Sequence, residues 1–97
     1  MEKLEGDELR FATRDLEGWK FLGDAIHKDF TFRGFRAAIA FVNRIAEQAT
    51  AVGHHPDLEI HYNRVVVSLS THDAGGVTEK DVELAGKIDA VVEPGDD

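Results

Sequence analysis

Residues 34–53 of the chain read GFRAAIAFVNRIAEQATAVG, and this stretch decides the fold class. Its apolar side chains follow the i, i+3, i+4, i+7 spacing of a helix with one buried stripe. They are Phe35, Ala38, Ile39, Val42, Ile45, Ala46, Ala49 and Val52. Gly53 can adopt the left-handed conformation that ends a helix, and Pro56 disfavours helical geometry at His55. The spacing therefore predicts a helix over residues 34–52 that ends just before a His-His pair.

The chain on either side of this helix has the pattern of paired strands. Four short runs are bounded by turn residues, and two of them, residues 25–32 and 58–62, alternate in the way that a strand with two different faces does. These predicted strands cover residues 19–22, 25–32, 58–62 and 65–71. Gly23-Asp24 connects the first two, and Asn63-Arg64 connects the last two. Both connections are short enough for hairpins, so the strands are predicted to pair in an antiparallel way.

Two further helices complete the prediction. The first covers residues 7–16 and is closed by Gly18. The second runs from about residue 79 to 92, and a capping box from Thr78 to Asp81 begins it. The order of elements gives an α+β fold: a four-stranded antiparallel sheet with three helices packed on one face.

Size and composition indicate one acidic domain. The chain has 97 residues, which suits a single domain over residues 1–97 with a frayed acidic tail at 93–97. It contains no cysteine, so disulfides and thiol nucleophiles are excluded. The net charge of −8 argues against a nucleic-acid partner. No apolar run is long enough for a membrane span or a secretion signal, so we expect a cytoplasmic location, and a saline cytoplasm would also suit this charge.

Three of the five histidines lie at predicted junctions between elements. His54 and His55 follow the long helix, and His72 follows the last strand, just before Gly75-Gly76. Imidazole titrates near neutral pH and can donate or accept a proton. One histidine in a loop is more often an ordinary surface residue, but three that converge on one cleft suit acid/base chemistry. The sequence therefore predicts a histidine-based proton-transfer site.

Several motifs occur in a fixed order along the chain. They are Trp19, Phe30-Thr31-Phe32, Phe41-Val42-Asn43-Arg44, Gly53-His54-His55-Pro56-Asp57, Tyr62-Asn63-Arg64-Val65, the run THDAGGVTEKD at residues 71–81, and Leu84-Ala85. In this order and over nearly the whole chain, the sequence resembles the pterin-4a-carbinolamine dehydratase family. A His-His-Pro triplet alone would be weak, but the Thr-His run that follows makes the resemblance specific.

The resemblance implies an activity and a set of site residues. Enzymes of this family remove water from 4a-hydroxytetrahydrobiopterin to give quinonoid dihydropterin, in tetrahydrobiopterin recycling. They need no metal or organic cofactor, and the partner is the pterin substrate itself. The resemblance implies acid/base roles for His54 and His72 and an acidic site residue at Asp81. It implies substrate contacts from His55, Pro56, Thr71 and Trp19.

One position departs from the family, and two alternative functions stay open. Many members carry a glutamate four residues before the His-His pair, where this chain has Thr50; Glu47 is a possible substitute. The first alternative is a metal site made of His54, His72 and either His61 or Asp81, because imidazole and carboxylate suit zinc. The second is a non-enzymatic interaction protein, a role that some animal members of the family also have.

The chain is also expected to form a homo-oligomer, a dimer of dimers. A small domain gains stability by burying more apolar surface, and an edge strand can pair with a second copy. On the long helix, Ala37, Phe41 and Ile45 suggest apolar surface beyond the core-facing stripe. Family resemblance implies tetramers as well.

Overall fold

The protein is described by a computed structural model that covers residues 2–93. Its elements, in chain order, are α1 (Gly6–Ala12), β1 (Lys20–Leu22), β2 (Ala25–Thr31), α2 (Phe35–Val52), β3 (Asp57–His61), β4 (Arg64–Leu69), the 3-10 turn η1 (His72–Ala74) and α3 (Glu79–Ala90). The strands form one sheet in the order β1-β2-β4-β3, and every neighbouring pair is antiparallel. The predicted α+β fold with a four-stranded antiparallel sheet is confirmed.

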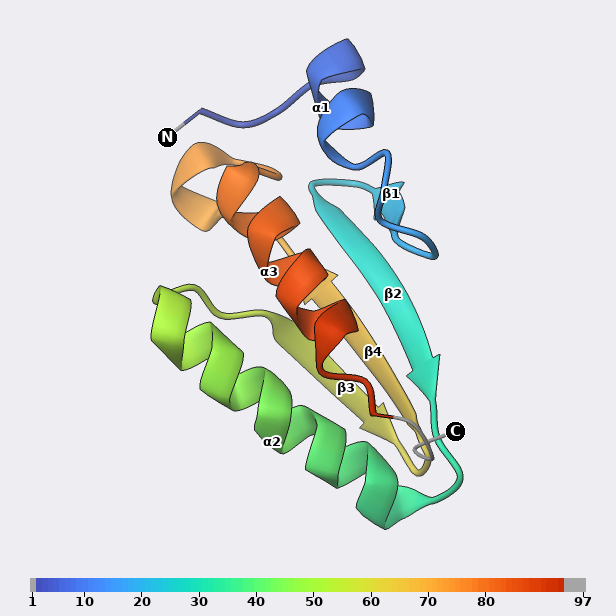
Figure 1. Ribbon diagram of the computed structural model, residues 1–97. Helices are drawn as coiled ribbons and strands as arrows, with labels where there is room; N and C mark the ends of the chain where they lie inside the picture. The colour runs from blue at the N-terminus through green and yellow to red at the C-terminus, as the bar shows by residue number, and fades with distance from the viewer. Residues whose placement is uncertain (1, 94–97) are drawn as a thin grey trace.

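The three helices lie in different positions relative to the sheet. In Figure 1, α2 and α3 lie against one face of the sheet, whereas α1 lies beyond the sheet's end, near β1 and the start of α3. The chain just before α1 is tied to the segment before α3 by a 2.7 Å hydrogen bond from the Leu4 amide to the Val77 carbonyl. Since α2 and α3 run in opposite directions, the end of α2 meets the beginning of α3 (Figure 1).

The core lies between the sheet and the two covering helices. Val65, Val67 and Leu69 alternate along the central strand β4, and each is fully buried. Phe41 of α2 packs its ring on Phe30, with the ring centroids 4.8 Å apart. Alternate residues of a strand face opposite sides, so these β4 side chains form one apolar row beneath the helices.

The same packing corrects one prediction about α2. Phe41 and Ile45 are fully buried within this single chain, so they are not surplus surface for a second subunit. The large apolar residue that α2 leaves in solvent is Phe35, which is 50% exposed. The sequence prediction failed because the helix stripe faces both the sheet and α3, and is therefore wider than one row of side chains.

Several element ends also differ from the prediction. The first helix ends at Ala12 and not at residue 16, because the backbone bonds that follow span three residues and not four, from the Arg14 amide to the Phe11 carbonyl and from the Leu16 amide to the Thr13 carbonyl. The turn between β3 and β4 is at Tyr62 and Asn63, one residue earlier than predicted, and Tyr62 has a φ of 54°. Helix α3 ends at Ala90, two residues before the predicted limit. Each difference is at an end, where local hydrogen bonds decide the boundary.

The predicted acidic tail begins at a residue that contacts α2. Glu93 forms an ion pair with Arg44 of α2, at 3.6 Å, while residues 94–97 lie outside the described chain. Among residues 2–93, no helix combines the length and apolar character that crossing a bilayer requires.

Candidate active site

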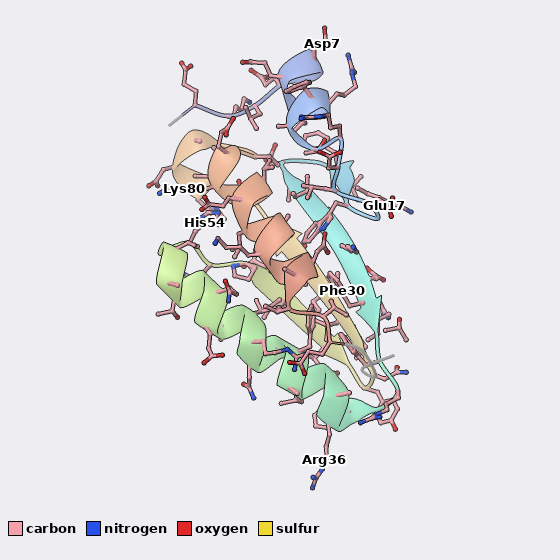
Figure 2. The ribbon with its side chains drawn as sticks, viewed as in Figure 1. Asp7, Glu17, Phe30, Arg36, His54 and Lys80 are labelled. Carbon is pink, nitrogen blue, oxygen red and sulfur yellow. The ribbon has the colours of Figure 1, made fainter. Side chains whose placement is uncertain are left out.

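The predicted histidine site lies where three elements end or begin. The end of α2, the segment after β4 and the first turn of α3 meet there, and Figure 2 shows His54 and Lys80 close together at this junction. They surround an open cleft of about 320 Å³. Its lining residues are Gly53, His54, His55, Ser70, Thr71, His72, Asp73 and Lys80. The convergence of His54, His55 and His72 is therefore a feature of the fold, although they come from two distant segments.

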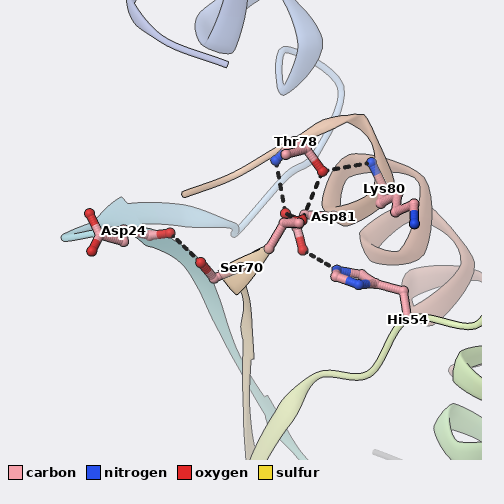
Figure 3. A network of polar contacts seen from close by, with 7 residues as sticks. Asp24, His54, Ser70, Thr78, Lys80 and Asp81 are labelled. Carbon is pink, nitrogen blue, oxygen red and sulfur yellow. Dashed lines mark hydrogen bonds and ion pairs between the residues drawn. The ribbon is translucent and has the colours of Figure 1, made fainter. Parts of the chain in front are cut away.

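His54 is aimed into the cleft by the way α2 ends. Gly53 takes the left-handed conformation, with φ 67°, that was expected of it, and the His54 amide donates to the Ala49 carbonyl at 3.2 Å. The imidazole then points toward α3, where Nε2 lies 2.5 Å from Oδ1 of Asp81 (Figure 3). The His54 side chain is only 12% exposed. It is therefore fixed by backbone geometry at one end and by a carboxylate at the other.

Asp81 lies beneath the cleft and is fully buried. Besides His54, its carboxylate accepts a hydrogen bond from the Thr78 amide and one from the Thr71 hydroxyl, both at 2.8 Å and both at Oδ2. The contact with the Thr78 amide belongs to the predicted capping box, which the structure confirms. The same side chain thus begins helix α3 and supports His54. A buried carboxylate with three donors is well satisfied without solvent.

The other two histidines lie at the open side of the cleft. His55 and His72 are both exposed, and His72 begins the η1 turn, one residue beyond Thr71. The loop is closed by the Thr71 amide, which donates to the Gly76 carbonyl at 2.8 Å, and by Gly75 in the left-handed conformation. A closed, glycine-ended turn holds His72 at the rim, where a bound molecule and solvent can both reach its ring.

Sequence reasoning missed three residues that line the cleft: Ser70, Asp73 and Lys80. Lys80 brings an ammonium group to the rim, and its position inside the predicted capping box was a usable signal for this. The first turn of a helix faces whatever precedes the helix, and here that is the loop with His72. Ser70 and Asp73 flank the Thr-His pair, so their placement follows once the loop is known.

Trp19 and Pro56 are not among the residues that line this cleft. Trp19 lies near the other end of α3, where its indole Nε1 donates to Oδ2 of Asp89 at 3.0 Å and its ring packs edge-on against Phe30. Pro56 is half-buried between the cleft and the start of β3. Of the four residues to which the resemblance assigns substrate contacts, His55 and Thr71 are therefore the two that line the cleft within this chain.

The metal alternative does not fit the structure. His61 is at the far end of β3, paired with Arg64 beside the turn, whereas His54 and His72 lie at the opposite end of the sheet. Within residues 2–93, no group of three or more histidine, cysteine or acidic side chains is arranged to hold a metal ion. Thr50 and Glu47 are both exposed on α2 and do not line the cleft.

Fold and site together define a small α+β domain with a histidine cleft supported by a buried carboxylate, an arrangement suited to moving protons. A family model described as pterin 4 alpha carbinolamine dehydratase matches residues 2–91. The chain belongs to this family.

Relatives and solved structures agree with that membership. A protein of Sulfurisphaera tokodaii, named after pterin-4-alpha-carbinolamine dehydratase, is 46% identical over 92 residues, which cover 95% of this chain and 99% of the relative. One of Thermosynechococcus vestitus with the same name is 49% identical over 87 residues, covering 90% and 92%. Both matches extend over nearly the full length of both proteins.

Two solved structures share the fold to different degrees. The crystal structure of a transcriptional coactivator/pterin dehydratase from Brucella melitensis has a TM-score of 0.90 and 37% identity, covering 95% of this chain and 100% of that one. A pterin dehydratase-like protein, identified as a RuBisCO assembly factor in the alpha-carboxysome, has a TM-score of 0.63 and 20% identity, covering 76% and 86%. The second likeness concerns the fold alone.

Proposed function

We propose that this protein is a dehydratase that removes water from a 4a-hydroxytetrahydropterin to give the quinonoid dihydropterin. Membership of the family supports the reaction, and the cleft supplies groups that suit it. The observation that carries the proposal is the contact between His54 Nε2 and Asp81 Oδ1, in a cleft that His72 also lines. It is the arrangement expected of an oriented imidazole that accepts a proton next to a second imidazole that donates one.

The reaction requires two proton movements and no change of oxidation state overall. The substrate carries a hydroxyl at C4a next to a ring N5–H. His54 takes the N5 proton, His72 gives a proton to the leaving hydroxyl, the C4a–O bond breaks, and a C4a=N5 double bond forms. Water is released. After the step, His54 holds the proton from N5 and His72 has lost one. His72 is exposed and regains a proton from solvent, and His54 releases its proton through the open cleft before the next turnover.

Asp81 takes part by orienting His54. Its carboxylate accepts from His54 Nε2 whether the ring is neutral or protonated, so this contact persists while the other ring nitrogen gains and loses a proton. Proton transfer from well-placed side chains is typically worth about 10²- to 10⁴-fold in rate. Two imidazoles are therefore enough for a hydroxyl that already leaves slowly without help, and no cofactor is part of the proposal.

The remaining parts of the proposal concern the substrate and its context. His55 lies at the exposed rim, where it is suited to contact the pterin ring. The open cleft is suited to contact the pterin ring more than the pterin's side chain, so we expect several pterins to be accepted as substrates. We place the reaction in tetrahydrobiopterin recycling in the cytoplasm.

A direct assay tests the proposal. The purified chain is mixed with freshly generated 4a-hydroxytetrahydropterin, and the decay of the substrate is followed by its ultraviolet absorbance. We expect the decay to accelerate in proportion to protein concentration. Decay at the uncatalysed rate, with a folded protein, would reject the enzymatic function and favour a non-enzymatic interaction protein.

A further inference from the structure

Two threonine hydroxyls form a continuous chain beneath the cleft. The Thr71 hydroxyl donates to Oδ2 of Asp81 at 2.8 Å, and it also lies 2.8 Å from the Thr78 hydroxyl. The Thr78 hydroxyl in turn accepts from the Lys80 amide at 3.2 Å (Figure 3). Thr78 and Asp81 are fully buried, and Thr71 is half-buried at the floor of the cleft. The chain links the first turn of α3 to the carboxylate that holds His54.

The direction of every bond in this chain follows from counting protons. A hydroxyl has a single proton to donate. Thr71 gives its proton to the Asp81 carboxylate, so in the contact between the two hydroxyls Thr78 must be the donor. The Thr78 oxygen remains free to accept from the Lys80 amide, as observed. Each group therefore donates to the next, from the Lys80 amide to the Thr78 hydroxyl, from there to the Thr71 hydroxyl, and finally to Asp81.

The contacts of Asp81 also determine which ring nitrogen of His54 carries the proton. Oδ2 of Asp81 is occupied by two donors, the Thr71 hydroxyl and the Thr78 amide, which fix the plane of the carboxylate. Oδ1 then faces His54 Nε2, and a carboxylate only accepts, so Nε2 carries the proton. In a neutral imidazole the other nitrogen, Nδ1, is consequently the one with a free lone pair.

We propose that Thr71 and Thr78 are positioning residues that act through Asp81 to hold His54 in the Nε2–H tautomer, so that Nδ1 is the atom that takes the proton. This inference rests on the proposed function and deepens it. It also changes the role of Thr71: its proton is committed to Asp81, so its hydroxyl supports the base and is not a donor to the substrate.

Single substitutions at Thr71 separate this role from a substrate contact. Thr71→Val removes the hydroxyl at nearly constant volume, and we expect kcat to fall roughly tenfold with KM changed less than about twofold. Thr71→Ser restores the hydroxyl and should rescue kcat. A rise in KM with kcat unchanged would overturn the proposal, because it would mean that Thr71 binds substrate.

A double-mutant cycle tests whether the two hydroxyls work as one chain. Thr78→Val should also lower kcat, and the variant with both substitutions should be no slower than Thr71→Val alone, because the chain is already broken. If the effects of the two substitutions on kcat multiplied, the two hydroxyls would have independent roles, and the proposal that they act as one chain would be refuted. Ile88→Val is the matched control for lost stability in α3, since Ile88 is fully buried on the same helix and lies outside the cleft. It should lower the melting temperature and leave kcat unchanged.

The tautomer can be measured without any turnover. Side-chain ¹⁵N NMR at alkaline pH distinguishes protonated from unprotonated ring nitrogens, and the His54 signals are identified by their loss in His54→Ala. In the unmodified chain we expect the Nε2–H form, and in Thr71→Val a mixture of the two neutral tautomers. Observation of the Nδ1–H form in the unmodified chain, or an unchanged tautomer in Thr71→Val, would overturn the inference. If the protein had no dehydratase activity but gave these NMR results, the proposed function would be rejected and the inference about the His54 tautomer would stand.

Discussion

Nζ of Lys28 lies 2.8 Å from Oδ1 of Asp89, so a charged pair links the inner side of β2 to the last turn of α3. Lys28 is paired with Val67 in the sheet register, and its alternation with Ile26 and Phe30 places it on the side covered by the helices. Its ammonium also donates to the Glu17 carbonyl at 2.8 Å. The pair therefore fastens the loop before β1, the sheet and α3 together.

Removal of Asp89 is expected to destabilise the fold. In Asp89→Ala, the Lys28 ammonium and the Trp19 indole N–H both lose their carboxylate partner in a site where the Lys28 side chain is 22% exposed. The free energy of unfolding should fall by about 1–3 kcal/mol, measured by urea denaturation. Asp29→Ala is the matched control, because it breaks a more exposed pair with Arg64 and should cost less than about 1 kcal/mol. Equal losses in the two variants would contradict a special role for the Lys28 pair.

Loss of either proposed proton-transfer histidine is expected to slow turnover. His54→Ala and His72→Ala should each lower kcat by roughly ten- to a thousandfold, because each removes a group that moves a proton. His55→Ala should act mainly on KM. Circular dichroism checks that each variant is folded. Unchanged turnover in both His54→Ala and His72→Ala would reject their catalytic assignment.

The net charge of −8 predicts that salt stabilises the fold. Like charges repel across the surface, and ions at moderate concentration screen them within about 10 Å. The melting temperature should therefore rise between low and moderate NaCl. The rise should shrink when exposed carboxylates are neutralised, as in Glu8→Gln combined with Glu83→Gln. A flat or falling melting temperature would count against adaptation to salt.

A homo-oligomer, most simply a dimer of dimers, is still predicted. The sheet ends in two edge strands, β1 and β3, and within residues 2–93 no further strand pairs with their outer sides. Exposed apolar side chains, such as Phe21 on β1 and Ile60 on β3, lie on the same strands, at 55% and 41% exposure. Sedimentation equilibrium at micromolar concentration should give a mass above that of the monomer. A monomeric protein with full activity would refute the assembly and leave the enzymatic proposal intact.

The elements of the fold could be predicted because each has a periodic pattern of its own. The helix now seen as α2 was predicted to within one residue, and the Thr78 capping box located the start of α3. The position of the Tyr62 turn could not be predicted in the same way, since the Asn63-Arg64 pair is the more usual turn sequence and Tyr62 adopts a conformation that few tyrosines take.

The sequence predicted that three histidines converge, and the structure places all three at one cleft, but their contacts could not be predicted. Histidines at element ends indicated a cleft, but the contact between His54 and Asp81 could not be predicted, because it depends on how α2 and α3 pack. Trp19 shows the opposite case. The family resemblance implied a substrate contact for Trp19, whereas within this chain its indole N–H binds Asp89, more than two turns along α3 from Asp81.

The residues that line the histidine cleft all lie between Gly53 and Lys80, so α1 and β1 contribute none of them. The residues of the cleft and those of the N-terminal helix and strand thus belong to different stretches of one small chain. Substitutions in α1, none of whose residues is buried, are therefore expected to leave the residues of the cleft in place. For an engineer, this makes α1, which has no buried residue and does not line the cleft, the place to attach a surface, a label or a second protein.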